Sequence, residues 1–395
     1  MGTLKQISAI TALNLRSIGQ RAAASVVLIL GVAGVVAVLV TVLAMAKGLS
    51  RTFMRTGAPD RALVLHKAAN TEGFSNIDVG WVGTIANAPG VLQGPGGTPA
   101  VCPERIVAAT LPLRSDGEQA NVTLRGTCPA ALLVHPDWRI VAGRMFRPGL
   151  HEVIVGTAAA NEFSGVDIGR HVRLGSTEWT VVGRFASDGD SHESEVLTDA
   201  RTLMAAFGWG AFSSVTVRLV SAGAFAGLRK ALISNPSLQV DVVRESTYYR
   251  QQSQGVSRLL TFVSTVVGAI MAIGAVFTAL NTMYSAISAR TAEIATLRAL
   301  GFGASGLVVS VLAEALLLSI LGALAGAAVA WLLFNGTSLN TEAGDFGSQL
   351  AFRLVVHPDV VAVGIVWACA IGLAGGLLPA IRAARLPVAT ALRPV

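Results

Sequence analysis

Four long apolar segments constrain this chain more than any other feature of its sequence. They occupy residues 22–46, 257–284, 307–334 and 360–381. A helix needs about 20 apolar residues to cross the roughly 30 Å hydrocarbon core of a bilayer, so each segment is long enough to span it. The composition agrees, because 52% of the 395 residues are apolar and only 13% are charged. The sequence predicts an α-helical membrane protein with four transmembrane helices.

The first apolar segment is interpreted as a retained span. Ala44-Met45-Ala46 resembles a signal-peptide cleavage site. The apolar core of a signal peptide is only about 7–15 residues long, however. The segment 22–46 is longer and follows a leader at residues 1–21. We therefore expect the helix to remain in the mature protein.

Lysine and arginine in the short polar segments predict the orientation. They gather in the leader 1–21, the segment 285–306 and the tail 382–395, whereas the loop 335–359 holds only Arg353. Positive residues favour the cytoplasmic side, so both termini of this multi-pass chain are predicted there. Basic residues also follow the first span, but long domains translocate largely regardless of charge. The net charge of +7 is explained by topology, and no nucleic-acid partner is expected.

Residues 47–256 differ from the rest of the chain and predict a large α+β periplasmic domain between the first two spans. Short β-branched or alternating runs recur between turn signals. Predicted strands occupy 61–65, 106–111, 120–124, 152–155, 171–174, 179–182 and 215–219. Predicted helices occupy 199–207 and 222–233, and a Gly/Pro-rich loop occupies 89–99. The acidic run 187–195 is interpreted as a solvated loop, although Asp188, Asp190, His192 and Glu195 could hold a cation; no metal motif is recognisable.

Two cysteines of the predicted periplasmic domain, Cys102 and Cys128, are expected to form a disulfide, because that compartment is oxidising. Cys369 lies in the last span. No histidine neighbours either of the first two cysteines in the sequence, so a catalytic thiol is not predicted. The chain is not expected to be an enzyme.

Polar and small residues mark the predicted spans. Glu314 and Asn281 are expected within the membrane, where an ionisable group is costly. A structural role for Glu314 is favoured over a proton relay, because such a relay would need further ionisable groups. Gly322 with Gly326, and Gly372 with Gly376, have the spacing that lets helices approach closely. Packing within one subunit and dimerisation explain these glycines equally well.

Two nucleotide-binding motifs are excluded. Gly301, Gly303 and Gly306 match a dinucleotide fingerprint in spacing, but they join a charged helix to a membrane span instead of a strand to a helix. Gly301 and Gly303 are interpreted as an elbow. A phosphate-binding loop needs Gly-Lys followed by Ser or Thr, and none of the four lysines follows a glycine. We expect no cofactor in this chain.

The segment 285–306 predicts a short charged helix and the elbow. At about 100° per residue, its large side chains fall on one face. These are Ile287, Arg290, Ile294, Leu297 and Arg298. Arginine and large apolar side chains dominate protein interfaces, so this face is suited to a partner. A helix lying on anionic lipid headgroups fits the face equally well.

Sequence motifs along nearly the whole chain resemble FtsX-like, MacB-type ABC transporter permeases. They include residues 281–301, Glu314-Ala315 with the glycines that follow, and Pro379-Ala380 with Arg382-Ala383-Ala384-Arg385. Residues 142–146, 152–156, 168–169 and 181–183 resemble the periplasmic core of that family, and Asn14-Leu15-Arg16 fits its amphipathic entry helix.

The resemblance implies a permease of the bacterial inner membrane that pairs with a second copy or a related permease. It also implies a cytoplasmic ABC ATPase, in two copies, that binds ATP and Mg²⁺. Because the chain carries no fused ATPase motif, this ATPase is expected to be a separate chain. The segment 285–306 becomes the coupling helix that contacts it. The implied contact residues are Arg290, Thr291, Glu293, Ile294, Leu297 and Arg298.

The leading functional hypothesis is an efflux permease that converts ATP hydrolysis into motion of its periplasmic domain. It would export or extract a hydrophobic, lipid or peptide-like cargo, with a periplasmic adaptor and an outer-membrane channel as further partners. The alternative is a signal relay that transports nothing and activates a periplasmic enzyme such as a cell-wall hydrolase.

Overall fold

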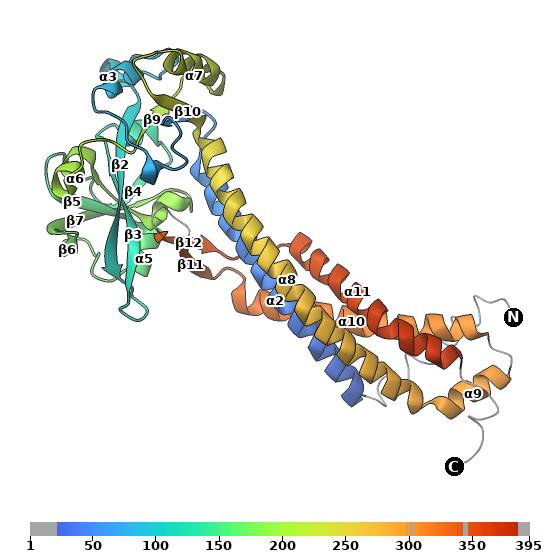
Figure 1. Ribbon diagram of the computed structural model, residues 1–395. Helices are drawn as coiled ribbons and strands as arrows, with labels where there is room; N and C mark the ends of the chain where they lie inside the picture. The colour runs from blue at the N-terminus through green and yellow to red at the C-terminus, as the bar shows by residue number, and fades with distance from the viewer. Residues whose placement is uncertain (1–21, 301–302, 343–346, 386–395) are drawn as a thin grey trace. The chain divides into compact units, whose positions relative to one another are not determined.

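The computed structural model describes residues 22–300, 303–342 and 347–385 (Figure 1). The predicted leader 1–21, the elbow residue Gly301 and the end of the tail from residue 386 lie outside this part. The chain divides into two compact units. The helical unit comprises residues up to 47, 258–337 and from 354 onward, and the sheet unit comprises 48–257 and 338–353.

Four helices of the described chain are long and apolar enough to cross a membrane. They are α2 (Ala22–Thr56), α8 (Glu245–Ser288), α10 (Ala304–Phe334) and α11 (Pro358–Ala384). At 1.5 Å per residue, the 44 residues of α8 extend over roughly 66 Å, about twice the thickness of the hydrocarbon core. α2 and α8 therefore exceed the predicted spans 22–46 and 257–284. Their additional turns, 48–56 and 245–257, belong to the sheet unit.

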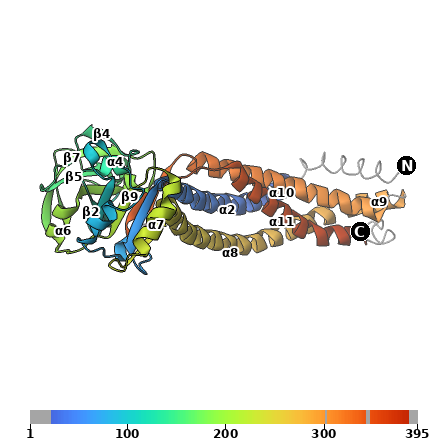
Figure 2. The ribbon, with the colours of Figure 1, turned by 90° about the horizontal axis from the view of Figure 1, so that it is seen from above.

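The four helices share one apolar core in the helical unit, where they run alongside one another (Figure 2). Residues such as Val32 of α2, Ala279 of α8, Leu318 of α10 and Ile371 of α11 are buried in it. Small residues allow this close packing, as shown by the positions that a Cβ atom would occupy. A Cβ at Gly326 would lie 2.4 Å from the Ala33 carbonyl oxygen.

The predicted glycine pairs both lie at contacts between helices of the same chain. Gly322 and Gly326 of α10 face α2, where a Cβ at Gly322 would lie 2.9 Å from Val32 Cβ. Gly372 and Gly376 of α11 face α10, where a Cβ at Gly376 would lie 2.8 Å from Ala315 Cβ. Packing within the subunit therefore accounts for all four glycines.

The sheet unit contains a ten-stranded mixed sheet in the order β10-β1-β9-β2-β3-β8-β5-β7-β4, with β6 paired to β7. Its pairs are antiparallel except β3 with β8 and β5 with β7. The strands are β1 (Arg61–His66), β2 (Val101–Pro112), β3 (Gln119–Thr127), β4 (Arg139–Gly143), β5 (Glu152–Gly156), β6 (His171–Leu174), β7 (Thr177–Ala186), β8 (Glu195–Asp199), β9 (Ser214–Arg218) and β10 (Val240–Arg244). Short helices are α3 (Trp81–Ala86), α4 (Ala131–Val134), α5 (Thr157–Glu162), α6 (Ala200–Phe207) and α7 (Phe225–Ile233).

Local sequence explains several of these elements. Alternate residues of β7, among them Trp179, Val181 and Phe185, are buried, as expected for a strand with one face in a core. Helix α6 begins where the Asp199 carboxylate accepts a hydrogen bond from Thr202 N, 2.9 Å away. It ends at Gly208, whose φ of 71° is left-handed and suits glycine. All seven predicted strands and both predicted helices have counterparts in the structure.

Two sequence interpretations differ from the structure. The acidic run 187–195 is not a solvated loop, because Asp190, His192 and Glu195 are buried and Ser191–Ser194 form the 3₁₀ helix η4. The polar side chains of this run make ion pairs and hydrogen bonds within the protein, and these take the place of the contacts with water that its acidic composition predicted. The loop 335–359 contains a β-hairpin of β11 (Ser338–Glu342) and β12 (Gln349–Arg353). Strands β4, β8 and β10 were also not predicted.

The contact at Gly326 yields a test of helix packing. Gly326→Ala should lower the melting temperature of the protein in detergent, because the new methyl group must displace the backbone of α2, and overpacking costs about 1–3 kcal/mol. Gly34→Ala on α2 is the matched control, since a Cβ there meets nothing within 4 Å. The control should match or exceed the wild-type melting temperature. Equal melting temperatures for the two variants would contradict the packing interpretation.

Candidate functional site

The predicted coupling segment contains helix α9 (Thr291–Ala299), which lies between α8 and α10 in the sequence. Arg290 precedes its first turn and is only 7% exposed, and Ile294 is 5% exposed. Ile294 packs in a cluster with Ile287 of α8, Leu307 of α10 and Ala380 of α11. Part of the face predicted to dock a partner thus anchors α9 to its own subunit.

Arg298 also makes an internal contact, because its Nη1 donates a hydrogen bond to the carbonyl oxygen of Ala384, 2.9 Å away. The surface of α9 is formed instead by the small and polar residues Ala292, Glu293, Thr296 and Ala299, which are exposed. Leu300 follows at 71% exposure. The outward face of α9 therefore consists mainly of small and polar residues, with Leu300 beside them, and Ile294 and Arg290 of the predicted docking face do not contribute to it. The side chain of Leu297 lies outside the described part.

Polar residues of the long helices differ in their surroundings. Glu314 of α10 is 6% exposed, with Arg290 as a charged neighbour. Asn281 of α8 is exposed on its helix. The structure therefore buries Glu314 within the subunit and leaves Asn281 on its surface. Gly303 is the residue before α10 and has an extended backbone that any residue can adopt, so the elbow at Gly301 and Gly303 stays a prediction.

A second candidate site is the buried charged cluster of the sheet unit, which is centred on Arg125 of β3. Its guanidinium group contacts three carboxylates. Arg125 Nε lies 2.6 Å from Glu195, and Nη1 lies 2.8 Å from Glu104 and 3.2 Å from Glu72. All four residues are at most 7% exposed. Such a group of charges is stable in a protein interior only when its members are paired.

The surroundings divide the three acids into two kinds. Burial is the largest single effect at Glu104 and Glu195 and would raise the pKa of both carboxyl groups. Arg125 and His192 together, with His135 also acting on Glu104, outweigh burial and lower both pKa values to about 2. Burial dominates at Glu72 and raises the pKa of that carboxyl group. Burial would lower the pKa of His192, but Glu195 and Asp190 raise it to about 9. Two cations, Arg125 and protonated His192, thus balance the carboxylates Glu104 and Glu195.

The ends of the two longest helices enter this region of the sheet unit. Glu245, the first residue of α8, accepts hydrogen bonds from Arg61 Nε and from Ala58 N, the latter at 2.9 Å. Arg61 also pairs with Asp137. Thr56, the last residue of α2, donates a hydrogen bond from Oγ1 to Ser191 Oγ in η4, 2.9 Å away. Within the sheet unit, buried polar contacts therefore hold the last turn of α2 and the first turn of α8.

The β11–β12 hairpin, which connects α10 to α11, contacts the same region. Ser348 Oγ lies 2.6 Å from Thr123 Oγ1 of β3, and Ala351 N donates to Ser194 Oγ of η4 over 2.9 Å. A small cavity of about 40 Å³ lies between Arg125, the hairpin and the helix ends. Helices α2 and α8 and the α10–α11 connection consequently meet around Arg125 and η4.

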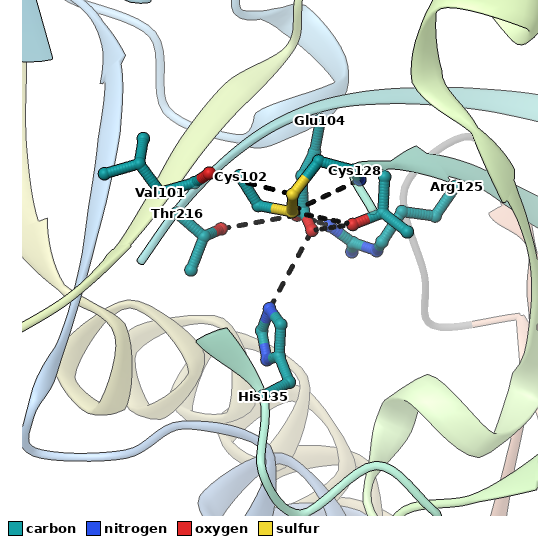
Figure 3. The surroundings of a disulfide bond; sticks show 8 residues. Val101, Cys102, Glu104, Arg125, Cys128, His135 and Thr216 are labelled. Atoms are coloured by element: carbon teal, nitrogen blue, oxygen red, sulfur yellow. Dashed lines mark hydrogen bonds and ion pairs between the residues drawn. A yellow bond between two sulfur atoms is a disulfide. The ribbon is translucent and has the colours of Figure 1, made fainter. Parts of the chain in front are cut away.

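The expected disulfide between Cys102 and Cys128 is present and borders the cluster (Figure 3). Glu104 lies close to it and accepts a hydrogen bond from Thr127 Oγ1 at 3.0 Å. His135 points toward Glu104 from the opposite side, with Nε2 3.8 Å from the carboxylate (Figure 3). The bond joins β2 to the end of β3, which carries Arg125.

Sequence reasoning found part of this cluster. The acidic run 187–195 drew attention to Asp190, His192 and Glu195, which are buried together, whereas Asp188 is exposed and pairs with Arg139. It missed Arg125 and its partners Glu72 and Glu104, because they come from segments far apart in the chain. No local sequence pattern marks them, because β3 around Arg125 mixes polar and apolar residues.

Comparison with known protein families identifies the family of this chain. Residues 25–234 match a MacB-like periplasmic core domain, and residues 265–388 match an FtsX-like permease C-terminal domain. The chain belongs to the MacB/FtsX family of ABC transporter permeases. The helical unit thus contains the family's permease helices, and residues 25–234 include most of its periplasmic domain.

Individual relatives are more distant. The macrolide export ATP-binding/permease protein MacB of Rhodospirillum rubrum is 27% identical over 386 residues, covering 92% of this chain and 57% of its own. The uncharacterized ABC transporter permease YknZ of Bacillus subtilis is 24% identical over 205 residues, covering 51% of this chain and 49% of its own. The chain therefore spans about half the length of these curated relatives.

Solved structures of two similar domains were also found. The periplasmic region of MacB from Actinobacillus actinomycetemcomitans is 13% identical, with a TM-score of 0.38, and the match covers 50% of this chain and 94% of that one. The extracellular domain of YknZ is 19% identical, with a TM-score of 0.36, covering 46% and 99% of the two chains.

Arg125→Gln tests the importance of the buried charges for this permease. The substitution leaves Glu104 and Glu195 without their cation, so we expect a loss of about 3–5 kcal/mol in unfolding free energy. Thermal unfolding of the purified protein measures it. Arg139→Gln is the control, since that arginine pairs with Asp188 at the surface and its removal should leave stability unchanged. A wild-type melting temperature for Arg125→Gln would show that the cluster does not stabilise the domain.

Proposed function

We propose that this permease converts ATP hydrolysis by a separate ABC ATPase into motion of its periplasmic domain. The continuity of α2 and α8 carries the proposal. Both contribute to the apolar core of the helical unit, and both have buried, hydrogen-bonded ends among the strands. An unbroken helix transmits displacement along its axis better than a flexible linker does, because every backbone hydrogen bond resists its extension.

Contacts within the helical unit support the proposed orientation. Lys47 of α2 pairs with Asp359 at the start of α11, whereas Arg298 of α9 contacts Ala384 near the end of α11. Helix α9 therefore lies at the end of the unit opposite to Lys47. With both termini in the cytoplasm, as the Lys and Arg distribution favours, α9 faces the cytoplasmic ATPase.

The cargo is proposed to be hydrophobic, lipid or peptide-like and to be handled by the periplasmic domain. Apolar side chains fill the core between the four helices, which gives a polar solute little to bind on a path through it. The full assembly would contain two permease chains and two ATPase copies binding ATP and Mg²⁺. A periplasmic adaptor and an outer-membrane channel would complete the export route.

The outward face of α9 provides the test of ATPase coupling. The double variant Glu293→Arg/Thr296→Arg should reduce co-purification of the ATPase and ATP-driven transport, because it places two large cations on a surface of small and acidic residues. The same double change at Glu118 and Gln119, on the exposed start of β3 in the sheet unit, is the matched control and should retain the partner. Unchanged co-purification and transport for the α9 variant would overturn the assignment.

A comparison with Ile294→Ala separates docking from folding. Ile294 is buried against α10 and α11, so its truncation should lower the melting temperature of the isolated permease. The surface variant should leave that temperature unchanged.

Stimulation of ATP hydrolysis by cargo in the reconstituted complex supports transport, whereas binding of a cell-wall hydrolase without such stimulation would indicate a regulatory relay instead.

A further inference from the structure

Three buried side chains of the sheet unit converge beside the Arg125 cluster. His135 follows α4, His192 lies in η4, and Glu245 begins α8. One potential ligand atom from each lies within 4.8 Å of those of the other two, and all three residues are at most 2% exposed. We propose that His135, His192 and Glu245 bind a zinc ion that joins η4 and the start of α8 to the sheet unit.

The hydrogen bonding of the two imidazoles supports a missing ligand. Within the described residues, His135 Nδ1 and His192 Nε2 have no hydrogen-bond partner. His135 Nε2 lies 3.8 Å from the Glu104 carboxylate, which is beyond hydrogen-bond distance. Buried polar atoms without partners are costly, and native structures seldom leave them so. A zinc ion would displace the proton from Nε2 of His192, release it to solvent, and coordinate that nitrogen together with one nitrogen of His135. A single ion would then give each ring a partner.

Neighbouring groups already hold the three side chains in place. The ring of His135 stacks on Trp138, with centroids 4.2 Å apart and planes inclined by 8°. His192 Nδ1 lies 3.2 Å from Glu195, and the Glu245 carboxylate is fixed through Oε2 by Ala58 N. A carboxylate behind a ligating histidine orients the ring and increases its basicity, as is common at zinc sites.

The donor types select the metal. Two imidazoles and one carboxylate, with a fourth position open for water, are typical of zinc, whereas calcium and magnesium prefer oxygen ligands. The ion pairs around the three residues also favour a divalent cation, because their carboxylates outnumber their guanidinium groups. The carboxylates are Glu104, Asp137, Glu195 and Glu245, and the guanidinium groups are Arg61 and Arg125.

The experiment uses the full-length chain, purified in mild detergent without a histidine tag, stripped with EDTA and reloaded with ZnCl₂ or CoCl₂ at pH 8. We expect one equivalent of zinc per chain by mass spectrometry, and a visible absorption band for tetrahedral Co²⁺. Zinc should also raise the melting temperature of the stripped protein. Less than about a tenth of an equivalent would overturn the proposal, since a structural site binds zinc tightly.

His135→Gln and His192→Gln should each weaken zinc binding by at least about 100-fold, the upper end of what loss of a supporting residue costs. His171→Gln is the matched control, because His171 is exposed on β6, and it should bind zinc as the wild type does. Equal binding by all three variants would show adventitious binding elsewhere and refute the site.

X-ray absorption of the zinc-loaded wild type keeps the test independent of whether the variants fold. The proposal requires two imidazole ligands with the remaining ligands oxygen. A zinc shell containing sulfur, or one without imidazole, would refute it.

The zinc measurements involve no ATPase, so the two proposals are tested separately. A negative zinc result would not contradict the proposed coupling function, and a negative coupling result would not contradict the zinc site.

Discussion

The ion pairs of Arg125 are the interaction on which the architecture of the sheet unit depends. One guanidinium group holds Glu72 from the loop after β1, Glu104 from β2 and Glu195 at the start of β8. A buried charge is tolerable only while its partners stay in position, because moving one of them away exposes the full cost of its burial. The cluster therefore penalises partial opening of the domain, which suits the rigid-body motion that we propose for it.

Rigidity in the helical unit has a different physical origin. Its core is apolar, and close packing of small residues replaces ion pairs, as where Gly326 meets α2 and Gly376 meets α10. In lipid there is little hydrophobic gain from bringing helices together, so such contacts depend on backbones approaching closely enough for van der Waals attraction. The two units thus owe their rigidity to different interactions. Buried ion pairs stabilise the sheet unit, and close packing of small residues stabilises the helical unit.

The sequence was sufficient wherever a local pattern carries the information. Apolar segments predicted the four long helices, and alternation predicted strands such as β7, because burial of one face imposes a period of two. Contacts between distant segments carry no such pattern. The sequence alone could not show that Arg125 meets Glu104, nor that His135 approaches His192. The prediction of a solvated loop at residues 187–195 was wrong for the same reason. Its charges indicated exposure to solvent, but they have buried partners, including Arg125, that come from distant parts of the chain.

Helix α9 shows how tertiary packing changes the meaning of a helical projection. Ile294 lies on the face with the largest side chains, and large side chains serve equally well to dock a partner or to fix a helix to its own subunit. The structure uses Ile294 for the second purpose, since it packs against α10 and α11. The proposed coupling role needs both properties, because a force applied at Glu293 would reach the long helices only if α9 could not shift independently of them. In this proposal, the buried face fixes α9 to its subunit and leaves the exposed face for the ATPase.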